Sequence, residues 1–85
     1  MKHRELLQAT GLLRQGMWDD AHRIVQYRED SLACWIHALL HKIEPDEGNS
    51  RYWYARTSHS YHDFAATEQE LQAIEDALNT GKLSE

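Results

Sequence analysis

The sequence predicts an all-α fold of about five short helices in one domain over residues 1–85. Apolar residues recur three and four positions apart along most of the chain, which is the helical period. No stretch of useful length alternates between apolar and polar residues, as a half-buried strand does. Gly, Pro and helix-capping residues divide the chain into pieces of helical length. We therefore expect two helical hairpins and a C-terminal capping helix.

The first hairpin is expected over residues 3–28. A first helix should run from about residue 3 to 15, because Gly16 supplies a stop signal. Two aspartates then suit the positively polarised first turn of a second helix, which should end near Arg28. The short connection makes the two helices antiparallel. Their apolar faces are Leu6, Ala9, Leu12 and Leu13, followed by Met17, Ala21, Ile24 and Val25.

The second hairpin is expected over residues 31–57. Asp30 or Ser31 can cap its first helix, and Pro45 breaks that helix. A fourth helix should begin around position 47 or 49 and end near Thr57. The residues predicted to face inward from the third helix are Leu32, Trp35, Ile36, Leu39 and Ile43.

The last helix is expected over residues 67–80, after a loop over residues 58–66 that has no clear period. Thr67 and Glu70 have the spacing of a capping box, in which the two side chains bond reciprocally to backbone N–H groups. Gly81 should end this helix. Asp63 and the scattered Glu residues are expected on the surface. The inward face is Leu71, Ile74 and Leu78.

Composition and charge exclude several classes of function. Nine Lys and Arg against fourteen Asp and Glu give a net charge of -5, and no segment concentrates the basic residues. A nucleic-acid backbone would therefore be repelled. The N-terminus leads directly into an amphipathic pattern, so we expect neither a signal peptide nor a membrane span. Cys34 stands alone, which excludes an internal disulfide and favours a cytoplasmic location.

The two predicted hairpins share a short sequence pattern. Gly16-Met-Trp-Asp-Asp-Ala21 and Pro45-Asp-Glu-Gly-Asn-Ser50 each place a turn residue before acidic residues and a small residue. Here the chain resembles the tetratricopeptide class of helix-pair repeats, over residues 5–57. Ala21 and Ser50 are 29 residues apart, which is shorter than the usual repeat length of about 34 residues. The chain has two repeat units, whereas about three are normally needed for stability.

The resemblance implies a role for several residues. It assigns the small position of each first helix to Ala9 and Ala38, and that of each second helix to Ala21 and Ser50. Val25 and Tyr54 take the bulky position that follows. In this register His37 and His41 would be buried between helices. The apolar period of the third helix instead turns them away from its inward face, and the two alternatives stay open.

The segment Trp35-Ile-His-Ala-Leu-Leu-His-Lys-Ile-Glu44 carries a stripe of polar residues. His37 and His41 lie four positions apart and Glu44 three further on, so all three share one helix face. Two imidazoles at this spacing can ligate one divalent transition metal such as zinc. His37 and Glu44 would be about 10 Å apart along the axis, so Glu44 is expected to orient His41 rather than to ligate.

Such a site needs further ligands from elsewhere in the chain. His22 on the second helix is the most favoured. Spacing leaves other candidates open, namely Asp19, Asp46, His59 and His62. The signature of the helical metalloproteases is absent, because no Glu follows the first His directly.

Aromatic residues and arginines form a second concentration, which we interpret as a binding surface. Tyr52, Trp53 and Tyr54 are consecutive, so they cannot all face inward from one helix. Trp, Tyr and Arg are favoured anchors at protein interfaces. The surface we predict comprises Tyr52, Trp53, Arg56, Arg51 and Trp18.

The sequence therefore favours a small non-catalytic helical module that binds a protein or peptide without a cofactor and can self-associate. The alternative is a metal-binding protein that uses His37, His41, Glu44 and His22 with zinc or another divalent transition metal. Cys34 and His37 have the spacing of a thiol and its base, but no third residue is placed to orient them. The sequence thus does not favour an enzyme.

Overall fold

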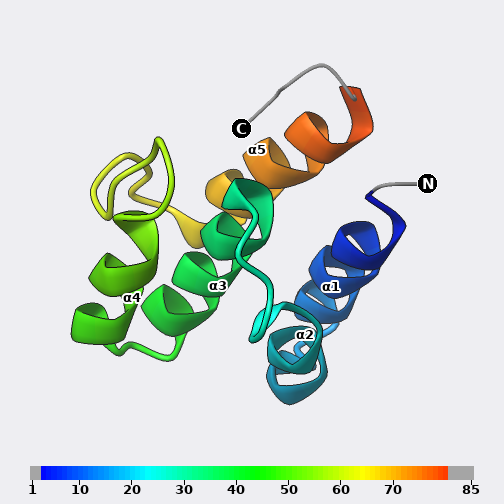
Figure 1. Ribbon diagram of the computed structural model, residues 1–85, viewed down its shortest axis with the longest axis horizontal. Helices are drawn as coiled ribbons and strands as arrows, with labels where there is room; N and C mark the ends of the chain where they lie inside the picture. Colours follow the sequence, from blue (N-terminus) through cyan, green and yellow to red (C-terminus); the bar gives the residue numbers. More distant parts are fainter. Residues whose placement is uncertain (1–2, 81–85) are drawn as a thin grey trace.

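The computed structural model of the chain describes residues 3–80, which form five α-helices and no strand (Figure 1). This confirms the predicted all-α fold. No helix within this part of the chain is long and apolar enough to cross a membrane. Gly81, the predicted end of the last helix, lies outside the described residues. The helices are α1 (Arg4–Arg14), α2 (Trp18–Val25), α3 (Ser31–Ile43), α4 (Glu47–Tyr54) and α5 (Thr67–Thr80).

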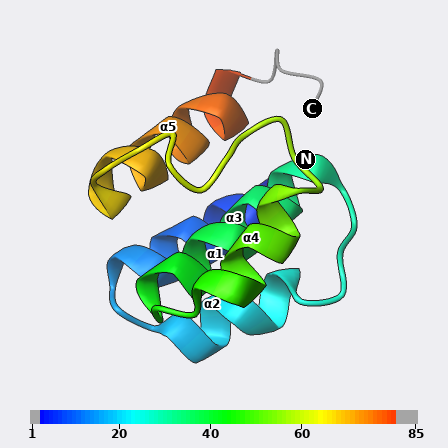
Figure 2. The same cartoon turned by 90° about the vertical axis from the view of Figure 1, so that its left-hand side faces the viewer.

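Helix α3 is the centre of the molecule, because it packs against each of the other four helices. Its residues 32–41 are all buried. Helices α1 and α2 lie on one side of α3, and α4 runs back along its other side (Figure 1). Helix α5 lies over the layer formed by the other four (Figure 2). This ten-residue stretch of α3 therefore has no face left for solvent.

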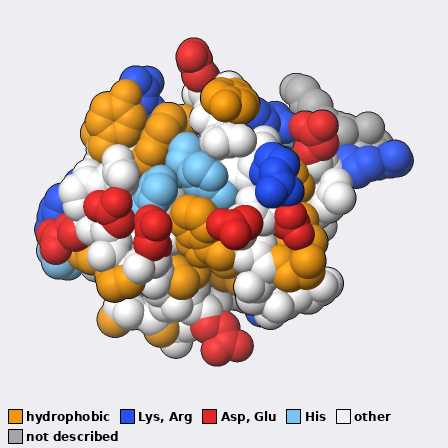
Figure 3. Space-filling view, turned by 90° about the horizontal axis from the view of Figure 1, so that it is seen from below, with side chains coloured by type: hydrophobic (Ala, Val, Ile, Leu, Met, Phe, Trp, Pro, Cys, Tyr) orange, Lys and Arg blue, Asp and Glu red, His pale blue; other side chains and the backbone are white. Residues whose placement is uncertain are grey.

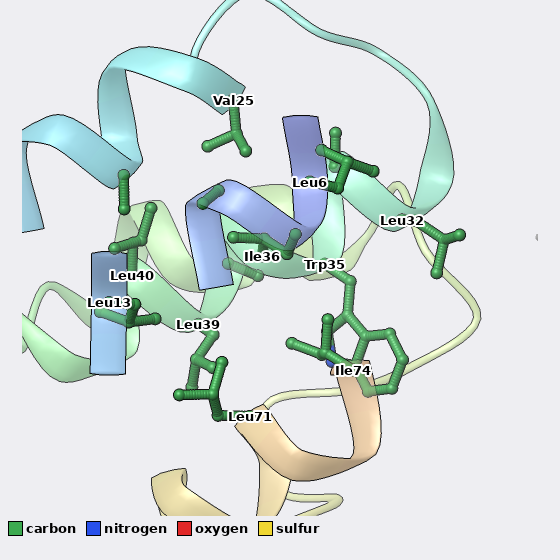
Figure 4. Close-up of a cluster of buried hydrophobic side chains, with 14 of the residues drawn as sticks. Leu6, Leu13, Val25, Leu32, Trp35, Ile36, Leu39, Leu40, Leu71 and Ile74 are labelled. Carbon is green, nitrogen blue, oxygen red and sulfur yellow. The ribbon is translucent and has the colours of Figure 1, made fainter. Parts of the chain in front are cut away.

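The hydrophobic core collects side chains from every helix (Figure 4). Several large aliphatic side chains are completely buried, namely Leu6, Ile36, Leu39, Leu40 and Ile74, and each contributes about 1.5–3 kcal/mol relative to exposure. The predicted inward face of the last helix is confirmed, and that of the first is confirmed except for the partly buried Leu12. On the second helix Ala21 and Val25 are buried, but Met17 is 41% exposed because it precedes the helix in the turn. The core residues labelled in Figure 4 are Leu6, Leu13, Val25, Leu32, Trp35, Ile36, Leu39, Leu40, Leu71 and Ile74.

Small residues allow the paired helices to approach closely. Ala9, Ala21, Ala38 and Ser50 have no exposed surface. The Ser50 hydroxyl donates a hydrogen bond of 2.7 Å to the carbonyl of Ala38, which joins α4 to α3. These four are the residues to which the repeat resemblance assigns the small positions, and the resemblance itself stays a prediction.

The turns explain where the helices begin and end. Gly16 has a φ of 79°, a left-handed conformation that costs glycine least, and it ends α1 as predicted. The Asp46 carboxylate accepts a hydrogen bond of 3.3 Å from the Asn49 amide and so caps α4. Asp30 lies at the N-cap position of α3 but makes no side-chain capping hydrogen bond, because its carboxylate accepts from Arg28 at 3.0 Å instead.

Two predicted helix ends are wrong by three residues. Helix α2 ends at Val25 rather than near Arg28, because the Arg28 amide donates to the carbonyl of Val25 in a tight turn. Helix α4 ends at Tyr54 rather than near Thr57. The Thr57 amide and hydroxyl both donate to the Tyr54 carbonyl, at 2.9 and 2.8 Å, which closes the helix early.

Ile43 was predicted to face inward and is 41% exposed. It is the last residue of α3, where the chain turns away towards α4. The other four residues of the predicted face are buried.

Glu70 does not form the predicted capping box and is not on the surface, because its side chain is fully buried. Its carboxylate accepts hydrogen bonds from Lys42 Nζ at 2.8 Å, from the Trp35 indole at 2.9 Å and from the Tyr54 hydroxyl. We call these four residues the Glu70 cluster. Burial, followed by the hydrogen bond to Glu70, raises the pKa of Tyr54 and keeps it a donor.

Lys42 also fastens the connection between α4 and α5. Its ammonium group donates to the carbonyls of Tyr61 at 2.9 Å and Phe64 at 2.8 Å. A lysine with only 9% of its side chain exposed thus satisfies all three donors within the protein. The Glu70 cluster therefore holds the connection and α5 against α3 and α4.

Candidate metal centre

Three histidines converge where α2 meets α3. His37 and His41 are one helical turn apart on α3, and His22 lies on the facing surface of α2. Each residue offers a ring nitrogen, and the three nitrogens all lie within 4.8 Å of one another. Figure 3 shows a group of histidine side chains at the middle of one face, beside hydrophobic and acidic side chains. We call His22, His37 and His41 the histidine cluster.

The spacing within the cluster suits a metal ion. The Nε2 atoms of His22 and His37 are 3.1 Å apart. In a tetrahedral zinc site with Zn–N bonds of about 2.0–2.1 Å, two ligand nitrogens lie about 3.3–3.4 Å apart. The His41 nitrogen lies within 4.8 Å of both, so it would have to move closer to complete such a set. Without a metal, His22 and His37 form a hydrogen bond in which one neutral ring donates.

The structure decides between the two alternatives for His37 and His41. Their side chains are 3% and 8% exposed, so the outward orientation predicted from the spacing of apolar residues is wrong. The spacing of apolar residues did not predict this burial, because α3 is packed on all sides and its less apolar face lies against α2 and α4. His22 is half-buried and lies closest to solvent of the three.

Glu44 is positioned to orient His41. Its carboxylate lies 2.7 Å from Nδ1 of His41, which leaves Nε2 of that ring free for a metal. A carboxylate behind a ligating imidazole fixes the tautomer and raises the basicity of the ligand. Glu44, Asp46 and His41 also form a second group with ligand atoms within 4.8 Å of one another. Asp46 is therefore beside the histidine cluster but is not part of it.

Two tryptophans flank the histidine cluster. Trp18 stacks on His22 with ring centroids 4.8 Å apart, and Trp53 stacks on His37 at 4.0 Å. The Trp18 indole N–H donates to the Leu40 carbonyl at 2.8 Å, which holds that ring in place. Both tryptophans belong to the predicted binding surface. Their stacking on histidines is not predictable from the sequence, because nothing local indicates a ring partner on another helix.

His37 is the most constrained of the three. Its Nδ1 atom is buried without a hydrogen-bond partner, which costs about 1–3 kcal/mol in either tautomer. Burial, together with His22 and His41, lowers the pKa of His37 to about 3. Burial and His41 also lower the pKa of His22. Both rings are therefore neutral at pH 7, as metal ligands must be.

The metal-free chain is expected to lose stability as the pH falls below about 6.5. The folded chain keeps His37 neutral down to about pH 3, whereas the unfolded chain protonates it below its ordinary pKa of 6.5. Because the unfolded state then binds more protons, the free energy of unfolding should fall by about 2 kcal/mol between pH 7 and about pH 5 through His37 alone. Urea unfolding with a chelator present measures this change.

Two variants separate this effect from general acid sensitivity. His62→Ala changes an exposed histidine and should follow the wild-type profile. His37→Gln should flatten the dependence between the same two pH values. An equal free energy of unfolding for the wild type at pH 7 and pH 5 would show that His37 is not held neutral.

The other candidate ligands lie outside the histidine cluster. His59 stacks on Trp35 at 3.6 Å, and His62 bonds to Arg51 at 3.0 Å. Asp19 is exposed on α2 and belongs to neither group of potential ligands found in residues 3–80. His22 is thus the cross-helix residue that the structure brings to His37 and His41.

The predicted binding surface is only partly continuous. Tyr52 is 52% exposed and meets Trp53 edge to face at 5.0 Å. The Arg56 guanidinium lies over both rings, 5.0 and 5.5 Å from their centroids, and donates to the Tyr52 hydroxyl at 2.9 Å. Arg51 instead pairs with Glu47 at 2.6 Å, and Trp18 lies across the histidine cluster. Tyr52, Trp53 and Arg56 therefore form one surface without the other two.

Comparison of the chain with protein-family models, with curated proteins and with solved structures gave no match.

Proposed function

We propose that this chain is a small metal-binding protein in which His22, His37 and His41 hold one zinc ion or a similar divalent transition metal. The observation that supports this most strongly is the convergence of three ring nitrogens within 4.8 Å from two helices. Imidazole is a good ligand for zinc, and three histidines with an outside ligand are a familiar zinc site.

The surroundings of the cluster support the same function. Glu44 orients His41, as carboxylates behind zinc-bound histidines do. Burial lowers the pKa of His37 and of His22, so protons do not compete with a metal at these rings near pH 7. The cost of the unpartnered Nδ1 of His37 would be offset by metal coordination, whose free energy is larger.

A calorimetric zinc titration of the chelator-treated chain tests this proposal. We expect one zinc ion per chain for the wild type and for His62→Ala, which changes an exposed histidine outside the cluster. Binding should be lost in His22→Ala. His22 is half-buried rather than part of the core, so this variant should still fold.

A second function is supported by the surface of Tyr52, Trp53 and Arg56, which suits a peptide or protein partner rich in acidic residues. The half-exposed Tyr52 ring offers apolar contact, and the exposed Arg56 offers a positive charge. Replacing both by alanine should abolish enrichment of acidic peptides from a random display library and leave zinc binding intact. Equal enrichment by the double variant would contradict this function. The same surface could join two copies of the chain.

We also propose that the protein works in the cytoplasm. Cys34 is a free, buried cysteine, which is compatible with a reducing compartment.

A further inference from the structure

The ligand set of the histidine cluster stops at three residues. Within residues 3–80, no fourth His, Cys, Asp or Glu has a ligand atom within 4.8 Å of all three histidine nitrogens. Glu44 and Asp46 form a group with His41 and not with the complete histidine cluster. The thiol of Cys34 is buried beside the Arg28 carbonyl, 4.0 Å away. Structural zinc sites are closed by four protein ligands, whereas catalytic sites have three and an open position.

The cluster can be reached from outside the molecule. His22 is half-buried, so one edge of the cluster reaches the molecular surface. Trp18 and Trp53 line the cluster, because their rings stack on His22 and His37 respectively. The Trp18 N–H points to the Leu40 carbonyl, so it is not available to a ligand at the metal. These two rings limit a fourth ligand to a small one.

Charge decides the kind of ligand. Three imidazoles are neutral when they ligate, so a divalent ion here keeps both positive charges. The Glu44 carboxylate is hydrogen-bonded to Nδ1 of His41 at 2.7 Å and is therefore not available as a ligand. An anion or a polarised water molecule in the fourth position would therefore be favoured over a neutral organic group.

On these grounds, and resting on the metal binding proposed above, we propose that the metal keeps one coordination position open to water or a small anion. The site is then of the type that zinc enzymes use to activate water, rather than a site that only holds the fold together.

Cobalt(II) in place of zinc tests this proposal, with azide as the probe anion. The metal-free wild type receives one equivalent of Co²⁺, and its visible spectrum is recorded before and during addition of azide. We expect the intense bands of four-coordinate cobalt, followed by a saturable shift of those bands with azide. His62→Ala should behave like the wild type, and His22→Ala should give neither signal.

The outcomes separate the two proposals. Failure of the wild type to develop cobalt bands would contradict metal binding itself. Cobalt bands that azide does not change would leave metal binding standing and overturn the open position. Sedimentation identifies one cause of the second result, because a cobalt-dependent dimer with an azide-insensitive spectrum would mean that another copy supplies the fourth ligand.

Discussion

Replacing Lys42 by methionine is expected to lower the free energy of unfolding by about 3–5 kcal/mol, a large part of the stability of a domain this small. The substitution leaves the Glu70 carboxylate fully buried, with only the Trp35 and Tyr54 donors. It also leaves the carbonyls of Tyr61 and Phe64 without their lysine donor. Urea unfolding at neutral pH measures the loss.

Two further variants isolate the buried charge. Arg23→Met breaks an ion pair with Asp20 in which the arginine side chain is 68% exposed. This variant should lower the free energy of unfolding by less than about 1 kcal/mol. Adding Glu70→Gln to Lys42→Met removes both charges, so the double variant should be more stable than Lys42→Met alone. A loss below about 1 kcal/mol in Lys42→Met would contradict the structural role of the Glu70 cluster.

The second large effect concerns zinc affinity. His22→Ala removes a ligand and should weaken zinc binding by more than ~100-fold, since a ligand contributes more than the residue that orients one. Glu44→Gln keeps the shape of the side chain and removes the charge behind His41, so a loss of about 10–100-fold is expected. Calorimetric titration of the variants beside the wild type measures both losses.

The graded order of these losses is itself informative. A metal held by exposed carboxylates alone would respond to Glu44→Gln and not to His22→Ala. The proposed site requires the larger loss in His22→Ala and none in His62→Ala. Zinc at one hundred times its dissociation constant should also stabilise the wild type by about 2.7 kcal/mol, which thermal unfolding would detect.

The five helices could be predicted because their signals are local. Gly16 and Pro45 interrupt the pattern within a few residues of where α1 and α3 end. The ends of α2 and α4 could not be predicted in the same way. Each depends on a turn that competes with the helix for a carbonyl, such as the double hydrogen bond from Thr57 to Tyr54.

The candidate site was only partly predictable. His37 and His41 are related by one helical turn, so their spacing alone brought them together. His22 was one of several cross-helix candidates, because spacing within α3 does not tell which face α2 presents to it. The burial of His37 and His41 depends on α3 being the central helix, a property of the whole fold.

The environment of Glu70 could not be predicted from its local sequence. Its side-chain partners Tyr54, Lys42 and Trp35 lie 16, 28 and 35 residues away in the sequence. The local pattern of Thr67 and Glu70 predicts a capping box, which would leave the carboxylate near solvent. A buried lysine and two aromatic donors on other helices offer more hydrogen bonds, and this tertiary arrangement prevails.

The calorimetric titration of the metal-free wild type with zinc tests most directly whether the histidine cluster is a metal site. We predict saturation at one zinc ion per chain, and loss of this binding in His22→Ala with the fold retained. Absence of saturable binding by the wild type, or equal binding by wild type and His22→Ala, would contradict it.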